Sequence, residues 1–388
     1  MSRLGIGVVG MGWMGDVHSR AYRQLTDRYA ELEVQPELVI CADAVVTRAH
    51  EAQRRHGFGQ TSQHWQDVTS HQAVDVVHVT TPNSQHKEIL LAALKAGKHV
   101  FCEKPVGCST TETAEIAAAA QQANVTSGVG YNYRWAPVVQ YARQLIRDGK
   151  LGDITHYRGR FLVDYASNPD SVLSWRFQRE HAGTGTLGDL MSHCVDLAHM
   201  LAGSISQVVS NHHTFISERP QATPGEGTHF SVDSGGPKGP VTNEDYVSAL
   251  ARFSNGAQGS FEVCRAAFGH FCENVIEVNG TKGRLLWNYE RMNELHLHLA
   301  DGGPENNGPT RLQAGPEHPS FSTFYPGAGN CMGYEDLKVI ETANFVKAIL
   351  KQESCEPGLN EAWEVAKVQA AMERSWKSEK WEDVEDVS

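Results

Sequence analysis

The sequence lacks the usual features of nucleic-acid-binding, membrane-spanning and disulfide-stabilised proteins. Its 388 residues carry 34 Lys and Arg against 46 Asp and Glu, a formal net charge of −12, which argues against non-specific nucleic-acid binding by clustered basic residues. No apolar run approaches the roughly 18 residues needed to span a bilayer, and residues 1–9 show no cleavable signal pattern. The eight cysteines are scattered without a C-x-x-C pair, which predicts reduced thiols in a cytoplasmic protein.

The first third of the chain alternates short apolar strands with helical stretches. We expect strands at 4–9, 38–42, 74–80 and 99–102. Ser109 and Glu112 form a capping box before a helical run at 113–122. Because the strands are apolar along their whole length, the pattern predicts a parallel sheet covered by helices on both faces.

After about residue 130 the pattern changes to longer, partly alternating strands. These are expected at 156–164, 246–253, 258–265 and 294–299. The pairs Asn255-Gly256 and Asn279-Gly280 predict hairpin turns. The Gly- and Pro-rich segment 217–240 predicts a long loop, and two helices are expected at 335–351 and 360–377. We therefore expect a second, α+β domain at 131–388 with an open-faced, mostly antiparallel sheet.

A glycine-rich segment follows the first expected strand and opens a helix. Residues 10–15 read Gly-Met-Gly-Trp-Met-Gly and match G-x-G-x-x-G. Gly10 would permit the tight turn, Gly12 the approach of a pyrophosphate, and Gly15 close helix–strand packing, with helix N–H groups facing the phosphates. This context predicts a Rossmann dinucleotide-binding domain at 1–130, with Trp13 and Met14 also at the cofactor. The alternative is a structural glycine-rich turn.

An acidic residue ends the second expected strand. The Asp43 carboxylate would accept hydrogen bonds from the adenosine ribose and repel a 2′-phosphate, so the sequence predicts NAD as the cofactor. Arg48 lies nearby and could meet a 2′-phosphate, which leaves NADP as the alternative.

Three further motifs follow in order along the chain. They are Thr81-Pro82-Asn83 with His86, Glu103-Lys104-Pro105, and Gly185-x-x-x-Asp189-x-x-x-His193-x-x-Asp196. Together with the opening glycines, they resemble the glucose–fructose oxidoreductase/inositol dehydrogenase (Gfo/Idh/MocA) family over essentially the whole chain. Within it, the segments 174–178, 236–240, 288–291 and 333–334 are most similar to levoglucosan dehydrogenases and related glycoside 3-dehydrogenases.

The resemblance implies a Rossmann domain followed by an open-faced sheet domain, with NAD(H) between them. It also implies reversible oxidation of a sugar or polyol hydroxyl to a ketone, with Lys104 as the catalytic lysine and Asp189 and His193 as the catalytic pair. Two departures from the family pattern could reshape the pocket floor. The usual triple glycine before the aspartate is Gly-Thr-Gly at 183–185, and Met191 replaces a frequent small residue.

The chemistry of these residues supports the same roles. Removing a hydride from a carbinol carbon requires a base near neutrality for the hydroxyl proton, and His193 has that character. Asp189 is four residues earlier, so one helix face would carry both. Lys104 follows a strand at the carboxyl edge, where it could bind the reacting oxygen. Taken without the resemblance, Asp189 and His193 could equally be a surface pair or half a zinc site, but no convincing third ligand follows, so we expect no metal.

The remaining candidates divide between cofactor and substrate. Thr81, Pro82, Asn83 and His86 are expected on the ribose–nicotinamide side, with turn and N-cap chemistry as the alternative for Asn83. Glu103 would orient Lys104 or touch the nicotinamide ribose.

Aromatic and guanidinium groups suit a sugar, stacking on C–H faces and donating to hydroxyls. Substrate contacts are therefore expected from Tyr133, Arg134, Trp175 and Arg176, with buried packing as the alternative for Trp175. His18 is interpreted as a structural histidine.

We therefore expect an NAD-dependent dehydrogenase of a sugar, anhydrosugar, glycoside or inositol. One alternative is an NAD-assisted glycoside-cleaving enzyme that recycles its cofactor. Others are a non-catalytic nucleotide-binding sensor, and a biliverdin- or dihydrodiol-type reductase on the same fold. The exposed sheet face predicts a homodimer or homotetramer.

Overall fold

The computed structural model describes residues 2–221, 231–233, 235–300, 303 and 307–385. The chain divides into two compact units. Unit 1 consists of Met1–Asn132 and Gly333–Trp363, and unit 2 of Tyr133–Met332 and Glu364–Ser388. The segment Gly333–Trp363 thus groups with the first part of the chain, whereas the sequence pattern assigned everything after residue 130 to a second domain.

Unit 1 is built on a six-stranded parallel sheet with the order β3-β2-β1-β4-β5-β6. Its strands are β1 (Ser2–Val9), β2 (Val34–Ala42), β3 (Gln60–Ser62), β4 (Val76–Val79), β5 (His99–Cys102) and β6 (Ser127–Val129). The strand order reverses between β1 and β4, so this is a doubly wound sheet with its switch point beyond the carboxyl end of β1. The expected parallel sheet is confirmed.

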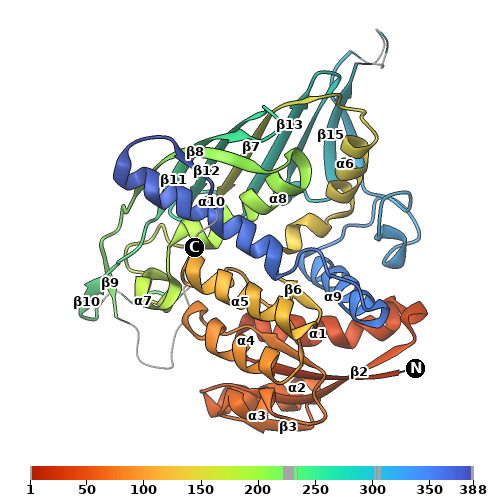
Figure 1. The fold of residues 1–388 in the computed structure, drawn as a ribbon, viewed down its shortest axis with the longest axis vertical. Helices are drawn as coiled ribbons and strands as arrows, with labels where there is room; N and C mark the ends of the chain where they lie inside the picture. Colours follow the sequence, from red (N-terminus) through yellow and green to blue (C-terminus); the bar gives the residue numbers. More distant parts are fainter. Residues whose placement is uncertain (1, 222–230, 234, 301–302, 304–306, 386–388) are drawn as a thin grey trace. The chain divides into compact units, whose positions relative to one another are not determined.

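Helices accompany this sheet in alternation with its strands (Figure 1). They are α1 (Trp13–Arg28), α2 (Val46–His56), α3 (Trp65–Thr69), α4 (His86–Lys95), α5 (Thr110–Ala123) and, from late in the chain, α9 (Tyr334–Lys351). The predicted cap of α5 is confirmed: the Ser109 hydroxyl accepts the Glu112 N–H at 3.2 Å, and the Glu112 carboxylate accepts the Cys108 N–H at 2.9 Å. Helix α9 packs against α1, which brings the late segment into this unit.

Unit 2 contains a nine-stranded sheet with the order β16-β15-β14-β13-β7-β12-β11-β8-β17. Every neighbouring pair is antiparallel except β7 and β12. The strands are β7 (Ile154–Leu162), β8 (Ile205–His213), β11 (Tyr246–Phe253), β12 (Gln258–Cys264), β13 (Glu273–Gly280), β14 (Gly283–Asn288), β15 (Glu294–Leu299), β16 (Thr310–Gln313) and β17 (Glu382–Asp383). The predicted mostly antiparallel sheet is confirmed.

Helices of unit 2 cover one face of this sheet, and the other face is open. These helices are α6 (Pro137–Arg147), α8 (Ser192–Ala202) and α10 (Leu359–Ser378), the last of which begins in unit 1. The one-turn helix α7 (Arg179–Ala182) packs instead on the short turn at Trp175–Phe177. Helix α8 packs on β7 and β13. Along β11, Val247, Ala249 and Ala251 are buried, whereas Leu250, pointing the other way, is 53% exposed. This alternation confirms the predicted open face.

Two expected turns have different outcomes. Gly256 adopts a φ of 91° between β11 and β12, so the first hairpin is confirmed. The second prediction is wrong by two residues, because Asn279 and Gly280 end β13 and the turn lies at 281–282. A Cβ on Gly280 would lie 2.2 Å from the Leu151 carbonyl oxygen, so a close backbone approach, not a turn, requires this glycine.

The expected loop at 217–240 is only partly irregular. Its two ends form β9 (Glu218–Pro220) and β10 (Lys238–Pro240), which pair antiparallel. Residues 222–230 and 234 of that prediction lie outside the described residues. Across the described chain, every helix is too short or too polar to cross a membrane.

Candidate functional site

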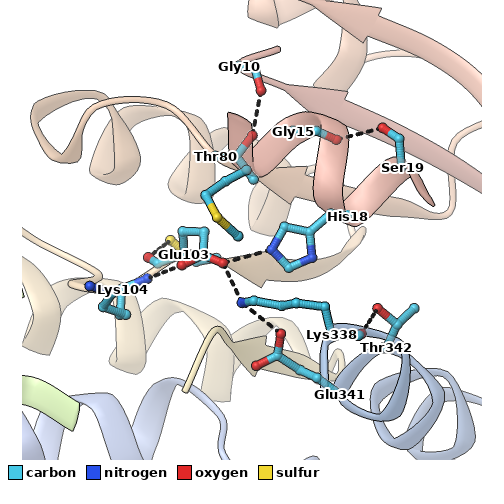
Figure 2. A network of polar contacts seen from close by, with 12 residues as sticks. Gly10, Gly15, His18, Ser19, Thr80, Glu103, Lys104, Lys338, Glu341 and Thr342 are labelled. Atoms are coloured by element: carbon cyan, nitrogen blue, oxygen red, sulfur yellow. Dashed lines mark hydrogen bonds and ion pairs between the residues drawn. The ribbon is translucent and has the colours of Figure 1, made fainter. Parts of the chain in front are cut away.

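The glycine-rich segment forms a tight loop between β1 and α1. Gly10 has a φ of 93°, and a Cβ there would lie 2.8 Å from the Thr80 backbone. A Cβ on Gly15 would lie 2.2 Å from the Gly10 carbonyl oxygen. The Thr80 hydroxyl donates to that same carbonyl at 2.5 Å (Figure 2). These contacts hold the first turn of α1 against the strand ends, an approach that only glycine permits.

The space in front of α1 fits a dinucleotide pyrophosphate. Gly12 is the N-cap residue, and it has no side chain to cap the first N–H groups of the helix. A Cβ added to Gly12 would meet nothing within 4 Å, so the approach to those N–H groups is open. A helix N-terminus of this kind attracts phosphate through its N–H groups and its dipole.

An aromatic pair borders this loop. The Trp13 side chain, 58% exposed, stacks on Tyr334 of α9 with ring centroids 5.4 Å apart. The Tyr334 hydroxyl donates to the Met14 sulfur at 3.6 Å. Tyr334 therefore contacts the glycine-rich loop through both Trp13 and Met14. The sequence indicated no role for Tyr334 beyond its part in the family resemblance.

Asp43 connects the end of β2 to the glycine-rich loop. One carboxylate oxygen accepts the Met11 N–H at 2.7 Å, and the other accepts the Val45 N–H at 2.8 Å. A carboxylate has about four acceptor sites, so this arrangement leaves capacity for ribose hydroxyls. Arg48 lies in the first turn of α2.

The loops after β4 and β5 are held together by a buried histidine. The His86 ring contacts the Pro105 carbonyl through Nδ1 at 3.0 Å and the Thr81 carbonyl through Nε2 at 2.9 Å. Burial lowers the pKa of His86. Pro82 caps the short turn that begins with the buried Asn83. His86 thus braces the two loops around Lys104.

Glu103, at the end of β5, is the centre of a buried network. Its Oε1 lies 2.7 Å from both Lys338 Nζ and His18 Nε2, and its Oε2 accepts the Lys104 N–H at 3.3 Å (Figure 2). Burial alone would raise the pKa of Glu103, but Lys338 and His18 outweigh burial and hold that pKa well below its usual range. The Lys104–Pro105 peptide is cis. No sequence pattern indicated that Lys338 contacts Glu103, and His18 was interpreted only as a structural histidine.

A second cluster lies in unit 2 at the start of α8. His193 is in the first turn of α8, and Asp189 is in the π-helical segment Leu187–Met191 that precedes it. The expectation that one regular α-helix carries both residues is therefore corrected: a wider turn separates them. π-helical turns of this kind occur frequently at functional sites.

Aromatic side chains surround His193, which is only 4% exposed. Its ring lies 4.7 Å from Tyr133, edge to face, and 6.0 Å from Phe161. Tyr289 packs on the same Tyr133 ring at 4.7 Å. The imidazole therefore lies among aromatic rings, with Tyr133 directly beside it. The substrate contact expected from Tyr133 stays a prediction.

Asp189 has a hydrogen-bond partner that the sequence did not reveal. The Tyr165 hydroxyl donates to Asp189 Oδ2 at 3.1 Å. Burial raises the pKa of the Tyr165 hydroxyl, and Asp189 raises it further, so this hydroxyl keeps its proton at neutral pH. Tyr165 thus orients the carboxylate as a permanent donor.

Arg134 differs from the other substrate-binding candidates. It is 2% exposed, and its guanidinium donates through Nε to Asp196 at 3.0 Å and through Nη2 to the other oxygen of the same carboxylate. The Arg134 guanidinium and Asp196 therefore form a buried, two-point ion pair inside unit 2.

Trp175 and Arg176, by contrast, are partly exposed. The Arg176 guanidinium lies 4.3 Å from the centre of the Trp175 ring. The Arg176 carbonyl accepts hydrogen bonds from Asn243 at 2.9 Å and Arg265 at 3.1 Å. These two side chains therefore stand on a well-anchored backbone.

Among the described residues, no group of three or more His, Cys, Asp or Glu side chains could hold a metal ion.

The structure places the predicted site residues in two groups, one in each unit. Unit 1 carries the glycine-rich loop, Asp43, the loops after β4 and β5, and Lys104. Unit 2 carries Asp189, His193 and Tyr133.

Comparison with known proteins agrees with this arrangement. A family described as "Oxidoreductase family, NAD-binding Rossmann fold" matches residues 4–131, and the "GFO/IDH/MocA C-terminal domain" matches residues 139–286. Levoglucosan dehydrogenase of Pseudarthrobacter phenanthrenivorans is 37% identical over 389 residues, covering 100% of both proteins.

Solved structures give the same result. Levoglucosan dehydrogenase in complex with NADH and levoglucosan matches with a TM-score of 0.93 and 36% identity, covering 99% of this chain and 100% of the other. An oxidoreductase domain protein from Kribbella flavida matches with a TM-score of 0.92 and 36% identity over 100% of both chains. The chain therefore belongs to the GFO/IDH/MocA family of oxidoreductases and carries that family's NAD-binding Rossmann fold.

Proposed function

We propose that this chain is an NAD-dependent dehydrogenase that reversibly oxidises a secondary hydroxyl of a sugar, anhydrosugar, glycoside or inositol to a ketone. The observation that carries the proposal is the cluster in unit 2, where an imidazole and an oriented carboxylate lie beside aromatic rings. Similarity to levoglucosan dehydrogenase over the full chain supports an anhydrosugar as the first substrate to test.

His193 is the proposed acid–base group. Oxidation of a carbinol removes the hydroxyl proton together with the hydride, and an imidazole in hydrogen-bond reach can take that proton. Asp189, held by Tyr165 at 3.1 Å, orients the substrate or the imidazole. The aromatic surroundings of His193 exclude water from the transfer.

Lys104 is the proposed cation at the reacting oxygen. It follows β5 at the carboxyl edge of the parallel sheet, where open α/β sheets bind ligands. Its ammonium would stabilise alkoxide character as the proton leaves.

Bound NAD supplies the hydride acceptor. The N–H groups at Gly12 and the start of α1 would hold the pyrophosphate, and Asp43 the adenosine ribose. Thr81, Pro82, Asn83 and Glu103 line the nicotinamide side in this proposal, while His86 braces their loops. Trp13 and Tyr334 border the loop.

Substrate recognition falls to residues of unit 2. Tyr133, Trp175 and Arg176 are the proposed sugar contacts, through C–H stacking and guanidinium donation. The buried pair with Asp196 supports a structural role for Arg134, and our proposal gives it no sugar contact. The assignment of residues 131–388 to a substrate-binding and oligomerisation domain stays a proposal, as does location in the cytoplasm.

Self-association is proposed through the open face of the nine-stranded sheet. A hollow there is lined by charged and apolar side chains, including Arg158, Arg160, Leu250, Glu262 and Glu277. A two-fold pair would bring this patch of each copy against the same patch of the other, and a patch that carries both arginines and glutamates suits such a pairing. We propose a homodimer or a homotetramer on this basis.

The first prediction concerns net oxidation. Purified protein with NAD and a panel of inositols, hexoses and 1,6-anhydrosugars should produce NADH in a one-to-one ratio with ketone. Glycoside cleavage without net NADH would show the redox-neutral alternative, and NADH binding without turnover on any of these substrates would favour a sensor. Absorbance at the NADH band, with ketone measured separately, decides between them.

The second prediction concerns the acid–base and cation roles. His193→Asn and Lys104→Met should each lower kcat/KM by about 10²–10⁴-fold while NADH binding stays close to wild type. His213→Asn, at the exposed end of β8, is the matched control and should change little. Turnover within a factor of two of wild type in either site variant would reject that residue's role.

The third prediction concerns Tyr165. Tyr165→Phe removes one hydroxyl from the Asp189 carboxylate and should lower kcat by about tenfold, the effect of one hydrogen bond to a charged group. Tyr246→Phe removes an exposed hydroxyl from the same unit and serves as the control. An unchanged kcat in Tyr165→Phe would show that Asp189 needs no such orientation.

The fourth prediction concerns cofactor choice. Asp43→Asn keeps the side chain's size but removes its charge, so the kcat/KM ratio of NAD to NADP should fall about tenfold or more. Asp27→Asn, on an exposed aspartate of α1, should leave this ratio unchanged. A wild-type preference for NADP, or an unaltered ratio in Asp43→Asn, would remove the assignment.

A further inference from the structure

We propose that Lys338 of α9 is a positioning residue for the reaction: through the Glu103 carboxylate it fixes the peptide from which Lys104 projects. The inference rests on the proposed role of Lys104. It assigns a function to a lysine that lies far from the glycine-rich loop and from Lys104 in the sequence.

The contacts form a short chain from α9 to Lys104. Lys338 Nζ lies 2.7 Å from Glu103 Oε1, and the second oxygen of that carboxylate accepts the Lys104 N–H at 3.3 Å. Figure 2 shows the Lys338 side chain reaching from α9 to Glu103, with Lys104 on the opposite side of the carboxylate. A change in the position of the ammonium is therefore transmitted through one carboxylate to the Lys104 backbone.

The carboxylate has little room to adopt another position. A Cβ on Gly130 would lie 2.7 Å from Glu103 Oε1, so the backbone of the neighbouring strand end closes one side. His18 Nε2 closes another, at 2.7 Å from the same oxygen. Helix α9 is itself held by packing on α1 and by Phe345, whose ring lies 5.3 Å from Phe101 of β5. Lys338 thus acts from a rigid support.

One buried cation, Lys338, faces two carboxylates. Its ammonium faces the carboxylates of Glu103 and, at 3.0 Å, Glu341, with Tyr334 on the same helix also near. Burial would lower the pKa of Lys338, but Glu103 and Glu341 outweigh burial and hold that pKa above its usual range. Lys338 is therefore the cation that favours the ionised form of Glu103, and it also forms an ion pair with Glu341.

His18 is in hydrogen-bond contact with Glu103 and could replace this charge. It faces Glu103 and Lys338, and its ring packs on His78 of β4 at 4.1 Å. Burial, and then the charge of Lys338, lower the pKa of His18 to about 4, so it is neutral in the intact network. Without the Lys338 charge, one cause of that lowering disappears, and the Glu103 carboxylate favours a protonated His18.

Because a protonated His18 can replace the Lys338 charge, the positioning role of Lys338 can be tested by its dependence on pH. In Lys338→Met, His18 is protonated at pH values below its new pKa, and the protonated ring restores a cation beside Glu103. This cation is lost as the pH rises through that pKa. We expect kcat relative to wild type to be reduced about tenfold or more at pH 8.5 and to recover severalfold at pH 6. In His18→Asn/Lys338→Met this recovery should be absent.

The controls separate positioning from folding. Lys347→Met, on the exposed side of the same helix, should match wild type at both pH values. NADH binding and thermal unfolding are recorded for each variant at each pH. If Lys338→Met does not fold, the triple variant Glu103→Gln/Lys338→Met/Glu341→Gln removes the cation together with both carboxylates that face it and should fold, because none of these three side chains leaves an unpaired buried charge; its kcat should stay low at both pH values.

The outcomes that overturn the inference are specific. These are a Lys338→Met variant within twofold of wild-type kcat at pH 8.5, a loss of kcat equal at both pH values, or a wild-type kcat in the Glu103→Gln/Lys338→Met/Glu341→Gln triple variant. Lys104→Met is measured alongside. Full activity there would remove the proposed role of Lys104 itself, whereas an inactive Lys104→Met with an active Lys338→Met would reject only the positioning role.

Discussion

The organisation of unit 1 depends on one buried ion pair, between the Glu103 carboxylate and the Lys338 ammonium. An anion removed from water is stable only if its partners are complete, and the partners of Glu103 come from α1, from α9 and from the loop after β5. This requirement explains why a helix from the last part of the chain belongs to unit 1. It also places the charged network directly behind the strand end from which Lys104 projects.

In unit 2, the proposed site residues are also supported by neighbouring side chains, and here the supporting side chains are uncharged aromatic residues. A π-helical turn carries Asp189 ahead of α8, and Tyr165 supplies the hydroxyl that orients it. Tyr133 and Phe161 give His193 apolar surroundings. Each unit therefore carries proposed catalytic groups that are supported by buried residues: the Lys104 ammonium in unit 1, and the His193 imidazole with the Asp189 carboxylate in unit 2.

Features determined by short stretches of chain were predictable from the sequence. The parallel strands, the Ser109 cap of α5 and the sheet alternation of β11 follow from local patterns, and the glycines of the dinucleotide loop follow from a motif in context. The Gfo/Idh/MocA resemblance, carried by short motifs, is confirmed by full-length similarity. The catalytic roles of the site residues stay predictions.

Features determined by distant partners were not predictable. Lys338 lies in a helix of mixed charge, where a lysine is expected in solvent, and only the fold reveals its burial against Glu103. Tyr165 has no sequence spacing that relates it to Asp189. Gly280 follows an asparagine and therefore suggests a turn in the sequence. In the structure, the glycine is required because the Leu151 carbonyl oxygen lies close to its Cα. In each case the deciding contact joins residues that no periodicity connects.

The most direct test of the account is a crystal structure of the protein with NADH and a 1,6-anhydrosugar. The account predicts that Lys104 Nζ and a ring nitrogen of His193 both lie within hydrogen-bond reach, about 2.6–3.2 Å, of one sugar hydroxyl. The carbon that bears this hydroxyl should face the nicotinamide ring. A sugar that contacts only one of the two side chains, or a nicotinamide that faces neither of them, would contradict it.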